Sequence, residues 1–357
     1  MKNLKIIERF YISPITEEYA YEFYDLIKEQ ENEHICNENH SKEKAAKRNK
    51  EAWNLFEAIQ KQDLQAFVVI DRETNKSVCA ATFYDCWTGN CNGLYLEDIV
   101  TTKNMRGNGI GHLAMAALAQ ITLYKGYKNL SWECAKDNIN GHKFYDNFGS
   151  GYKQDKTTWR LFEPSFVPEG GCRNVFRILT NLEAQKYLND SEFNPQKHDM
   201  TALVAFDSGL NPAAKLIAHR SFSTFRCVSG MHINSFEYDD LKTARNMLIK
   251  QIQMQAKNGC MGHVDITLSQ KQQEPLELLL RDMGFEPLSF DNGIMVPRDL
   301  IGAALENAAK TKPYLIEDFI KHQRYLTEKN SDYSLDPVRP SENRSSNNDD
   351  NIPPPRL

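Results

Sequence analysis

The chain has 357 residues, of which 25% are charged and 41% are hydrophobic. This is the composition of an ordinary globular protein, and it excludes collagen, a coiled coil and a wholly disordered chain. The formal net charge of -5 provides no basic surface for phosphates, which argues against nucleic acid and anionic membranes and is compatible with a cationic ligand. No apolar run reaches the about 18 residues of a membrane helix. The amino terminus lacks the apolar stretch of a signal peptide, so we expect a soluble, cytoplasmic protein.

The first part of the chain predicts an α/β unit. A short strand over residues 5–12 precedes a helical stretch over residues 16–60. Alternating β-branched and aromatic residues then predict a meander of strands, followed by a helix, a strand, a short helix and a last strand. These elements cover residues 66–71, 77–84, 93–101, 111–125, 129–135, 139–148 and 158–163.

The second part of the chain repeats this order of elements. Its predicted strands cover residues 201–207, 215–225, 230–237, 262–268 and 293–297, and its predicted helices cover residues 241–257 and 274–283. A stretch rich in Pro and Gly separates the two parts. We therefore predict four segments: domains over residues 1–165 and 172–300, a helical extension over 301–330, and a disordered tail over 331–357 that is rich in Ser, Asn, Asp and Pro.

A glycine-rich loop lies between the strand 93–101 and the helix 111–125. It consists of Arg106, Gly107, Asn108, Gly109, Ile110 and Gly111. Glycines allow a ligand to approach the backbone, and the N–H groups and dipole of the following helix form a receptor for pyrophosphate. A glycine turn without a ligand is the alternative. A parallel dinucleotide-binding fold is disfavoured, because hairpins and no βαβ unit precede the loop.

Around this loop the sequence resembles the GCN5-related N-acetyltransferase (GNAT) superfamily, and within it the diamine N-acetyltransferases. The resemblance spans residues 1–165. The matching residues are Leu94-Tyr95-Leu96-Glu97-Asp98, Arg106 to Gly111, Asn138, Phe144-Tyr145, Gly149, Trp159-Arg160-Leu161-Phe162 and the hairpin Asp85-Cys86-Trp87-Thr88-Gly89.

The resemblance implies a mixed, largely antiparallel sheet that splits after its central strand, with helices on its faces, in two tandem copies. It also implies acetyl-CoA as the acyl donor. The backbone of Ile99, Val100 and Thr101 would bind the pantetheine arm, and the loop from Gly107 to His112 would bind the pyrophosphate. The residues that would lie along the cofactor are Asn138, Ile139, Asn140 and Gly141. We expect the first half alone to bind it.

The chemistry that the resemblance implies is direct attack by a primary amine, with no metal and no cysteine nucleophile. Glu97 would accept the proton that the ammonium ion must lose, and Tyr145 would protonate the departing thiolate. Each residue has a structural alternative. Glu97 and Asp98 could be a solvated strand pair, and Tyr145 could be an ordinary half-buried aromatic residue.

The predicted acceptor is a small polycation such as a diamine or polyamine. Glu97, Asp98 and Asp85 would supply converging negative charge, Trp87 an aromatic face for the alkylammonium chain, and Glu33 a further contact. Trp87 could instead be a packing residue. The diamine enzymes carry acids just before Trp-Arg-Leu-Phe, whereas this chain has Thr157 and Thr158, so we expect a looser preference among acceptors than in the diamine enzymes.

The second half has the order of the fold without its chemistry. Its corresponding loop has no glycine and contains Asp239 and Asp240, which would repel a pyrophosphate. Asn234 and Leu280 stand where the first half has Glu97 and Tyr145. We expect this half to brace or cover the first. Two other functions stay open: acetylation of another amine, such as a protein lysine or an aminoglycoside, and a non-catalytic CoA sensor. A homodimer is also left open.

Overall fold

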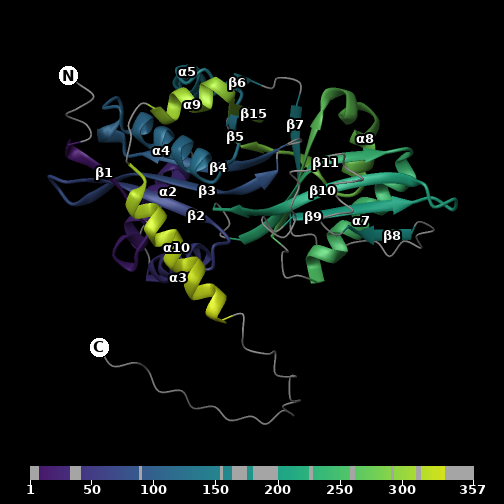
Figure 1. Cartoon of the computed structure of the whole chain (residues 1–357), viewed down its shortest axis with the longest axis horizontal. Helices are drawn as coiled ribbons and strands as arrows, with labels where there is room; N and C mark the ends of the chain where they lie inside the picture. The colour runs from purple at the N-terminus through teal and green to yellow at the C-terminus, as the bar shows by residue number, and fades with distance from the viewer. Residues whose placement is uncertain are drawn as a thin grey trace, which may run out of the picture.

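The computed structural model describes residues 8–32, 42–87, 91–152, 156–162, 175–179, 200–224, 228–257, 262–290, 293–310 and 315–333. These ranges form two mostly antiparallel sheets flanked by helices (Figure 1). The predicted α/β class is therefore confirmed. Of the predicted tail, only residues 331–333 are described, as the end of a helix; residues 334–357 lie outside the described part of the chain.

The first sheet begins with the predicted meander. Its strands are β1 (Phe10–Pro14), β2 (Gln65–Asp71), β3 (Lys76–Trp87), β4 (Asn92–Thr101) and β5 (Asn129–Ala135). The first four pair antiparallel in the order β1-β2-β3-β4, and β5 then pairs parallel to β4. All seven residues of β2 are buried, because helices cover both faces of this sheet.

Helices α2 (Ala20–Asn32) and α3 (Lys42–Gln60) cover one face of the first sheet. The single helical stretch predicted over residues 16–60 is thus two helices. On the opposite face lie α4 (Ile110–Tyr124), α9 (Gly302–Lys310) and α10 (Glu317–Tyr333). Phe319 of α10 packs its ring 6.3 Å from that of Phe67 and 5.8 Å from that of Phe83. The helical extension therefore belongs to the core of the first sheet.

The second sheet repeats the order of the first, as the sequence predicts. Its strands include β8 (Val175–Ile178), β9 (Met200–Phe206), β10 (Pro212–Ser223), β11 (Val228–Tyr238) and β12 (His263–Ser269), with helices α7 (Leu241–Lys257) and α8 (Gln270–Asp282). The pair β11–β12 is parallel, like β4–β5. Strand β8 was not predicted.

The two halves exchange their last strands. Strand β7 (Lys156–Phe162) leaves the first half and pairs with β12 and with β13 (Glu286–Pro287). Conversely, β15 (Gly293–Ile301) leaves the second half and pairs with β5, β6 (Gly151–Tyr152) and β14 (Ser289–Phe290). Segments 1–165 and 172–300 therefore do not each contain a complete sheet, and neither boundary marks a self-contained sheet.

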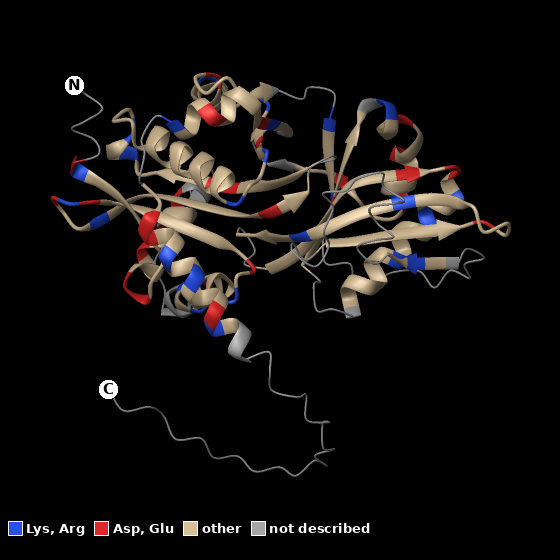
Figure 2. Ribbon diagram, viewed as in Figure 1, with Lys and Arg blue, Asp and Glu red and all other residues tan. Residues whose placement is uncertain are grey.

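Charged residues of both signs are interspersed along the elements of both halves in Figure 2. None of the described helices combines the length and the apolar character that a membrane span requires. The charged residues of the candidate site, described next, lie where the two halves meet.

Candidate active site

Strands β4 and β5 separate inside the first sheet. They pair only as far as Leu96 and Trp132, although both continue beyond this point. A bulge helps to bend β4: Thr82 of β3 pairs with Asp98, whereas Phe83 pairs with Leu96, so Glu97 is the extra residue. From Ile99 to Thr101 the edge of β4 that faced β5 is paired with no described strand. Its N–H and C=O groups can bind an extended ligand.

The glycine loop follows this open edge. Gly107 and Gly109 have φ angles of 77° and 78°, in the left-handed region that favours glycine. No side chain caps the first turn of α4 at Gly109, so its N–H groups are available to an anion. Arg106 Nε donates to the carbonyl oxygen of Thr101 at 3.0 Å, and Asn108 Nδ2 donates to that of Met105 at 3.2 Å. These bonds join the side chains of the loop to backbone carbonyls of the residues that precede it.

Helix α5 (Ile139–Asp146) packs directly against the start of α4. A Cβ atom on Gly111 would lie 3.2 Å from the ring of Phe144, so a larger residue would require that ring to shift. The ring of His112 packs 5.2 Å from that of Phe144, and Ile110 is buried beneath the loop. The glycine loop and α5 therefore form one structural unit.

The residues predicted to lie along the cofactor form the start of α5. Asn138 caps this helix, and its Oδ1 accepts a hydrogen bond from the N–H of Gly141 at 2.8 Å. Ile139 is 64% exposed, and Asn140 is also exposed. The start of the helix is thus accessible to a ligand that runs from the open edge of β4.

Glu97 and Asp98 lie together where β4 leaves β5. Asp98 accepts hydrogen bonds from Thr82 Oγ1 at 3.2 Å and from Thr224 of the second half. Burial raises the pKa of Asp98. Burial and the neighbouring Asp98 raise the pKa of Glu97 well above its usual range, although Arg160 opposes them. The second half therefore contacts Asp98 directly through Thr224.

Asp85 does not join these acids, contrary to the prediction. It follows Tyr84 on β3 and so points to the opposite face of the sheet from Thr82 and Tyr84. Its carboxylate accepts hydrogen bonds from Lys125 Nζ at 2.7 Å, Tyr127 Oη at 3.0 Å and Gln65 Nε2 at 3.0 Å. The charge of Asp85 is thus neutralised locally.

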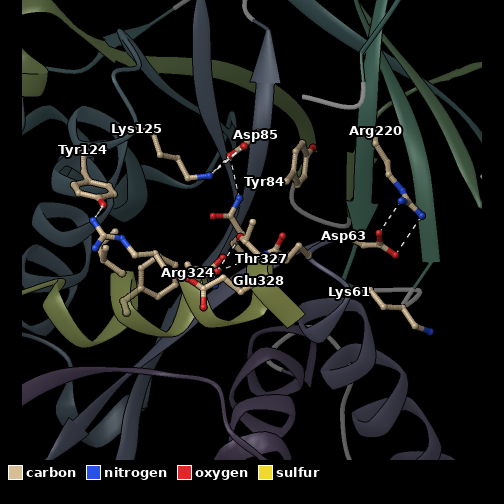
Figure 3. A pocket seen from close by; sticks show the side chains of 15 residues that line it. Lys61, Asp63, Tyr84, Asp85, Tyr124, Lys125, Arg220, Arg324, Thr327 and Glu328 are labelled. Carbon is tan, nitrogen blue, oxygen red and sulfur yellow. Dashed lines mark hydrogen bonds and ion pairs between the residues drawn. The ribbon is translucent and has the colours of Figure 1, made fainter. Parts of the chain in front are cut away.

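Asp85 instead lines a cavity of ≈ 670 Å³ under α10. Figure 3 shows Asp85 facing Lys125 there and Asp63 facing Arg220, at 2.6 Å in the second pair. Arg324 contacts the hydroxyl of Tyr124. Because these charges pair with one another, we do not assign the cavity to the acyl acceptor.

Trp87 presents no aromatic face to a ligand. Only 1% of it is exposed, and it packs with residues of the second sheet in one hydrophobic cluster: Leu179, Met200, Ala202, Val204, Phe206 and Ile217. The alternative that Trp87 is a packing residue therefore agrees with the structure. Glu33, the other predicted acceptor contact, lies outside the described residues.

Tyr145 lies on α5 beside the separated strands. Its ring is 4.8 Å from that of Trp132, the last residue of β5 that pairs with β4. Burial raises the pKa of Tyr145, and the charge of Asp98 adds to this effect, so the phenol keeps its proton at neutral pH. Tyr145 therefore lies next to the point where β4 and β5 separate, as do Glu97 and Asp98.

Arg298 is a residue of this site that the sequence did not indicate. It comes from the exchanged strand β15, is 2% exposed, and lies 5.8 Å from the centre of the Tyr145 ring. Its guanidinium contacts Ser150 Oγ at 2.7 Å, His142 Nδ1 at 2.8 Å and the carboxylate of Asp146. Only the strand exchange brings this arginine to α5, so no local sequence signal could have identified it.

The second half differs from the first at each equivalent position. Helix α7 is capped by Asp240, whose Oδ1 accepts hydrogen bonds from the N–H groups of Lys242 and Thr243, both at 2.9 Å. A carboxylate therefore occupies the place where α4 offers open N–H groups. A matching bulge makes Asn234 the counterpart of Glu97, as the alignment of the halves predicted. Leu280 is fully buried.

Residues 12–149 match the model of the Acetyltransferase (GNAT) family. The matched segment carries the glycine loop. Three solved structures are also similar to the chain. The GCN5-related N-acetyltransferase from Kribbella flavida is 13% identical, with 82% of this chain and 71% of that chain covered and a TM-score of 0.38. The one from Sphaerobacter thermophilus is 10% identical, with 82% and 96% covered and a TM-score of 0.47. A tandem GNAT protein from the clavulanic acid biosynthesis pathway is 10% identical, with 82% and 98% covered and a TM-score of 0.46.

GNAT acetyltransferases use acetyl-CoA as their acyl donor. The structure of this chain fits that donor in two places. The loop with left-handed Gly107 and Gly109 leaves room for a pyrophosphate beside the uncapped helix α4, and the open edge of β4 can pair with an extended amide-containing arm. Both features belong to the first half, and neither has a counterpart at the start of α7.

Proposed function

We propose that this chain is an acetyl-CoA-dependent N-acetyltransferase that acts on a primary amine of a small polycation, such as a diamine or polyamine. The observation that carries the proposal is the position of two half-buried acids, Glu97 and Asp98, at the point where β4 turns away from β5. A cationic amine that reaches the open strand edge must pass these carboxyls.

The binding residues have separate tasks. Gly107 to His112 and the edge of Ile99 to Thr101 hold acetyl-CoA, which supplies a thioester whose carbonyl carbon the amine attacks. Asp98 attracts the ammonium group, because opposite charges interact strongly in a poorly solvated site, and Glu97 orients it through its carboxyl oxygens, which accept hydrogen bonds. Asp85 and Trp87 take no part, since one is paired with Lys125 and the other is buried.

Two proton transfers complete the reaction. An ammonium ion has no lone pair. A carboxyl group of the site must therefore take one proton from it before the nitrogen can attack. Tyr145 keeps its phenolic proton at neutral pH and can donate it to the leaving sulfur. Arg298 lowers the pKa of Tyr145 and thereby favours that donation.

The proposal is tested by the release of thiol from acetyl-CoA in the presence of different amines. The panel contains a triamine, a diamine, a monoamine of equal length, an aminoglycoside and a lysine-bearing peptide. We expect kcat/KM to rise with the number of positive charges on the free amine. A higher kcat/KM for the peptide or the aminoglycoside than for every free polyamine would identify that compound as the acceptor instead. Binding of acetyl-CoA without turnover of any amine would favour a sensor over an enzyme.

A further inference from the structure

Glu133 lies opposite Glu97 where the two central strands separate. Trp132 and Leu96 are the last paired residues of β5 and β4, and the two glutamates follow them directly. Both side chains are half-buried, so a substrate can reach them. The charge of Glu133 is also one of the contributions that raise the pKa of Glu97.

A chain of hydrogen bonds connects Glu133 to the second half. Thr158, on the exchanged strand β7, donates its hydroxyl to Glu133. The Oγ1 atom of Thr158 is 2.8 Å from that of Thr267 on β12, and Thr267 Oγ1 is 2.8 Å from His232 Nε2 on β11. Burial lowers the pKa of His232 to about 4, so this ring is neutral at pH 7. The three side chains of this hydrogen-bonded series, Thr158, Thr267 and His232, are therefore uncharged.

Some neighbours of Glu133 favour its protonated form and others favour its carboxylate. Burial raises its pKa to about 7, and Asp265 adds to this effect. The hydroxyls of Thr158 and Tyr95 and the guanidinium of Arg160 stabilise the carboxylate. On the remaining neighbour, β15, Pro297 lies opposite Glu133 and carries no charge. Such a group gains and loses a proton readily near neutral pH.

Glu97 lacks this support. Burial, Asp98, Asp265 and Glu133 all disfavour its charged form, and only Arg160 opposes them. None of the described residues donates a hydrogen bond to its carboxyl. Fewer groups therefore stabilise the carboxylate of Glu97 than that of Glu133.

We infer that Glu133 is the residue that takes the proton from the acceptor ammonium ion, and that Thr158, held by Thr267 and His232, positions it. The inference rests on the proposed function. An N–H bond of the ammonium ion breaks, an O–H bond forms on Glu133, and the nitrogen keeps the electron pair with which it attacks. Half-buried Glu133 then returns the proton to water. Glu133 is thus a catalytic residue and Thr158 a positioning residue.

The first experiment measures kcat/KM for a triamine from pH 5 to 10 with wild type and Glu133→Gln. In the wild type we expect kcat/KM to fall below pH about 7, as the base becomes protonated. In Glu133→Gln we expect a loss of roughly 10² to 10⁴-fold at pH 7, a typical contribution of general base catalysis. The remaining activity should increase about tenfold per pH unit, because only amine that is already neutral can react.

A second variant tests the positioning role. Thr158→Val removes a hydroxyl that stabilises the carboxylate, so the pKa of Glu133 should rise and the acidic limb should move to higher pH. The activity at high pH should be retained. A purely structural defect would lower kcat/KM at every pH and leave the pH of the acidic limb unchanged.

The controls separate this inference from the proposed function. Glu277→Gln removes an exposed carboxylate on α8 and should leave the profile unchanged. Calorimetric binding of CoA checks that each variant is folded. If the wild type acetylates amines and Glu133→Gln keeps the wild-type kcat/KM at pH 7 and the break near that pH, while Glu97→Gln loses both, Glu97 is the base and the inference is wrong. If the wild type acetylates no amine, the proposed function fails and this inference with it.

Discussion

Arg160 and Asp265 form a two-bond ion pair between the halves of the chain. Arg160 Nε and Nη2 each donate to a carboxylate oxygen of Asp265 at 2.6 Å. The arginine belongs to β7 of the first half and the aspartate to β12 of the second, and they are 8% and 3% exposed. The ion pair therefore stabilises the pairing of the exchanged strand β7 with β12 in the second sheet.

Removing one partner of this pair should destabilise the protein strongly. We expect Asp265→Asn to lower the free energy of unfolding by about 3–5 kcal/mol, because buried Arg160 would lose the carboxylate that accepts hydrogen bonds from its Nε and Nη2. Urea unfolding measures the change. Glu277→Gln breaks an exposed pair with Arg281 and should have little effect.

The same pair predicts sensitivity to acid. Burial alone would raise the pKa of Asp265, but the Arg160 charge holds it below its ordinary value. The carboxylate thus contributes stability above that ordinary value of about 4. This contribution is lost as the pH falls through the lower pKa of the folded state. Asp265→Asn should flatten this part of the stability profile, and an unchanged profile would contradict the assignment.

A fragment that ends after residue 171 should not bind CoA. It lacks β15, so β5 would lose its pairing partner and Tyr145 would lose Arg298. This replaces the expectation that the first half suffices for binding. Calorimetry and circular dichroism on the fragment check the prediction, with a chain truncated after residue 333 as control. A folded fragment with wild-type affinity would show that the exchanged strand is dispensable.

Gly109→Glu should abolish CoA binding. The substitution places a negative side chain at the start of α4, where a pyrophosphate would accept the backbone hydrogen bonds. Its left-handed backbone would also be strained, and the matched control for that strain is Gly126→Glu at the other end of α4, where φ is 74°. Calorimetry should show binding in the control alone. Equal loss in both variants would indicate strain rather than charge.

Tyr145→Phe should reduce turnover while leaving the affinity for acetyl-CoA unchanged. The variant keeps the ring packed on Trp132 and removes only the proton donor. General acid catalysis typically contributes on the order of 10² to 10⁴-fold, and we expect a loss of kcat in that range. Tyr325→Phe, on the exposed face of α10, serves as the control. A loss in kcat below about threefold would point to another donor.

Asp98 and Asp85 should differ in their effect on acceptor choice. Asp98→Asn should reduce the preference for a triamine over a monoamine of equal length, because this acid faces the proposed acceptor site. Asp85→Asn should leave the preference unchanged, since Lys125 already neutralises that charge. The ratio of kcat/KM values measures the preference. Salt should weaken it, because long-range attraction is screened beyond about 8 to 10 Å at ordinary ionic strength.

Local patterns in the sequence were sufficient for the elements and for part of the site. Strand and helix periodicity located β2 to β5 and α4, and repetition of the order revealed the second sheet. Glycines at 107 and 109 marked the loop because only a left-handed backbone requires them there. Glu97 and Asp98 were identified because the segment from Leu94 to Asp98 resembles the diamine N-acetyltransferases.

Tertiary structure alone decided which sheet receives each last strand and which acids meet. Strands β7 and β15 have the same local pattern whichever sheet they join, so their exchange could not be predicted. Asp85 and Trp87 were misassigned because the residues that neutralise or bury them are distant in sequence, from Lys125 to Ile217. Glu133 and Arg298 gained their surroundings from partners that strand exchange brings near, because burial and charge depend on spatial neighbours rather than on position along the chain.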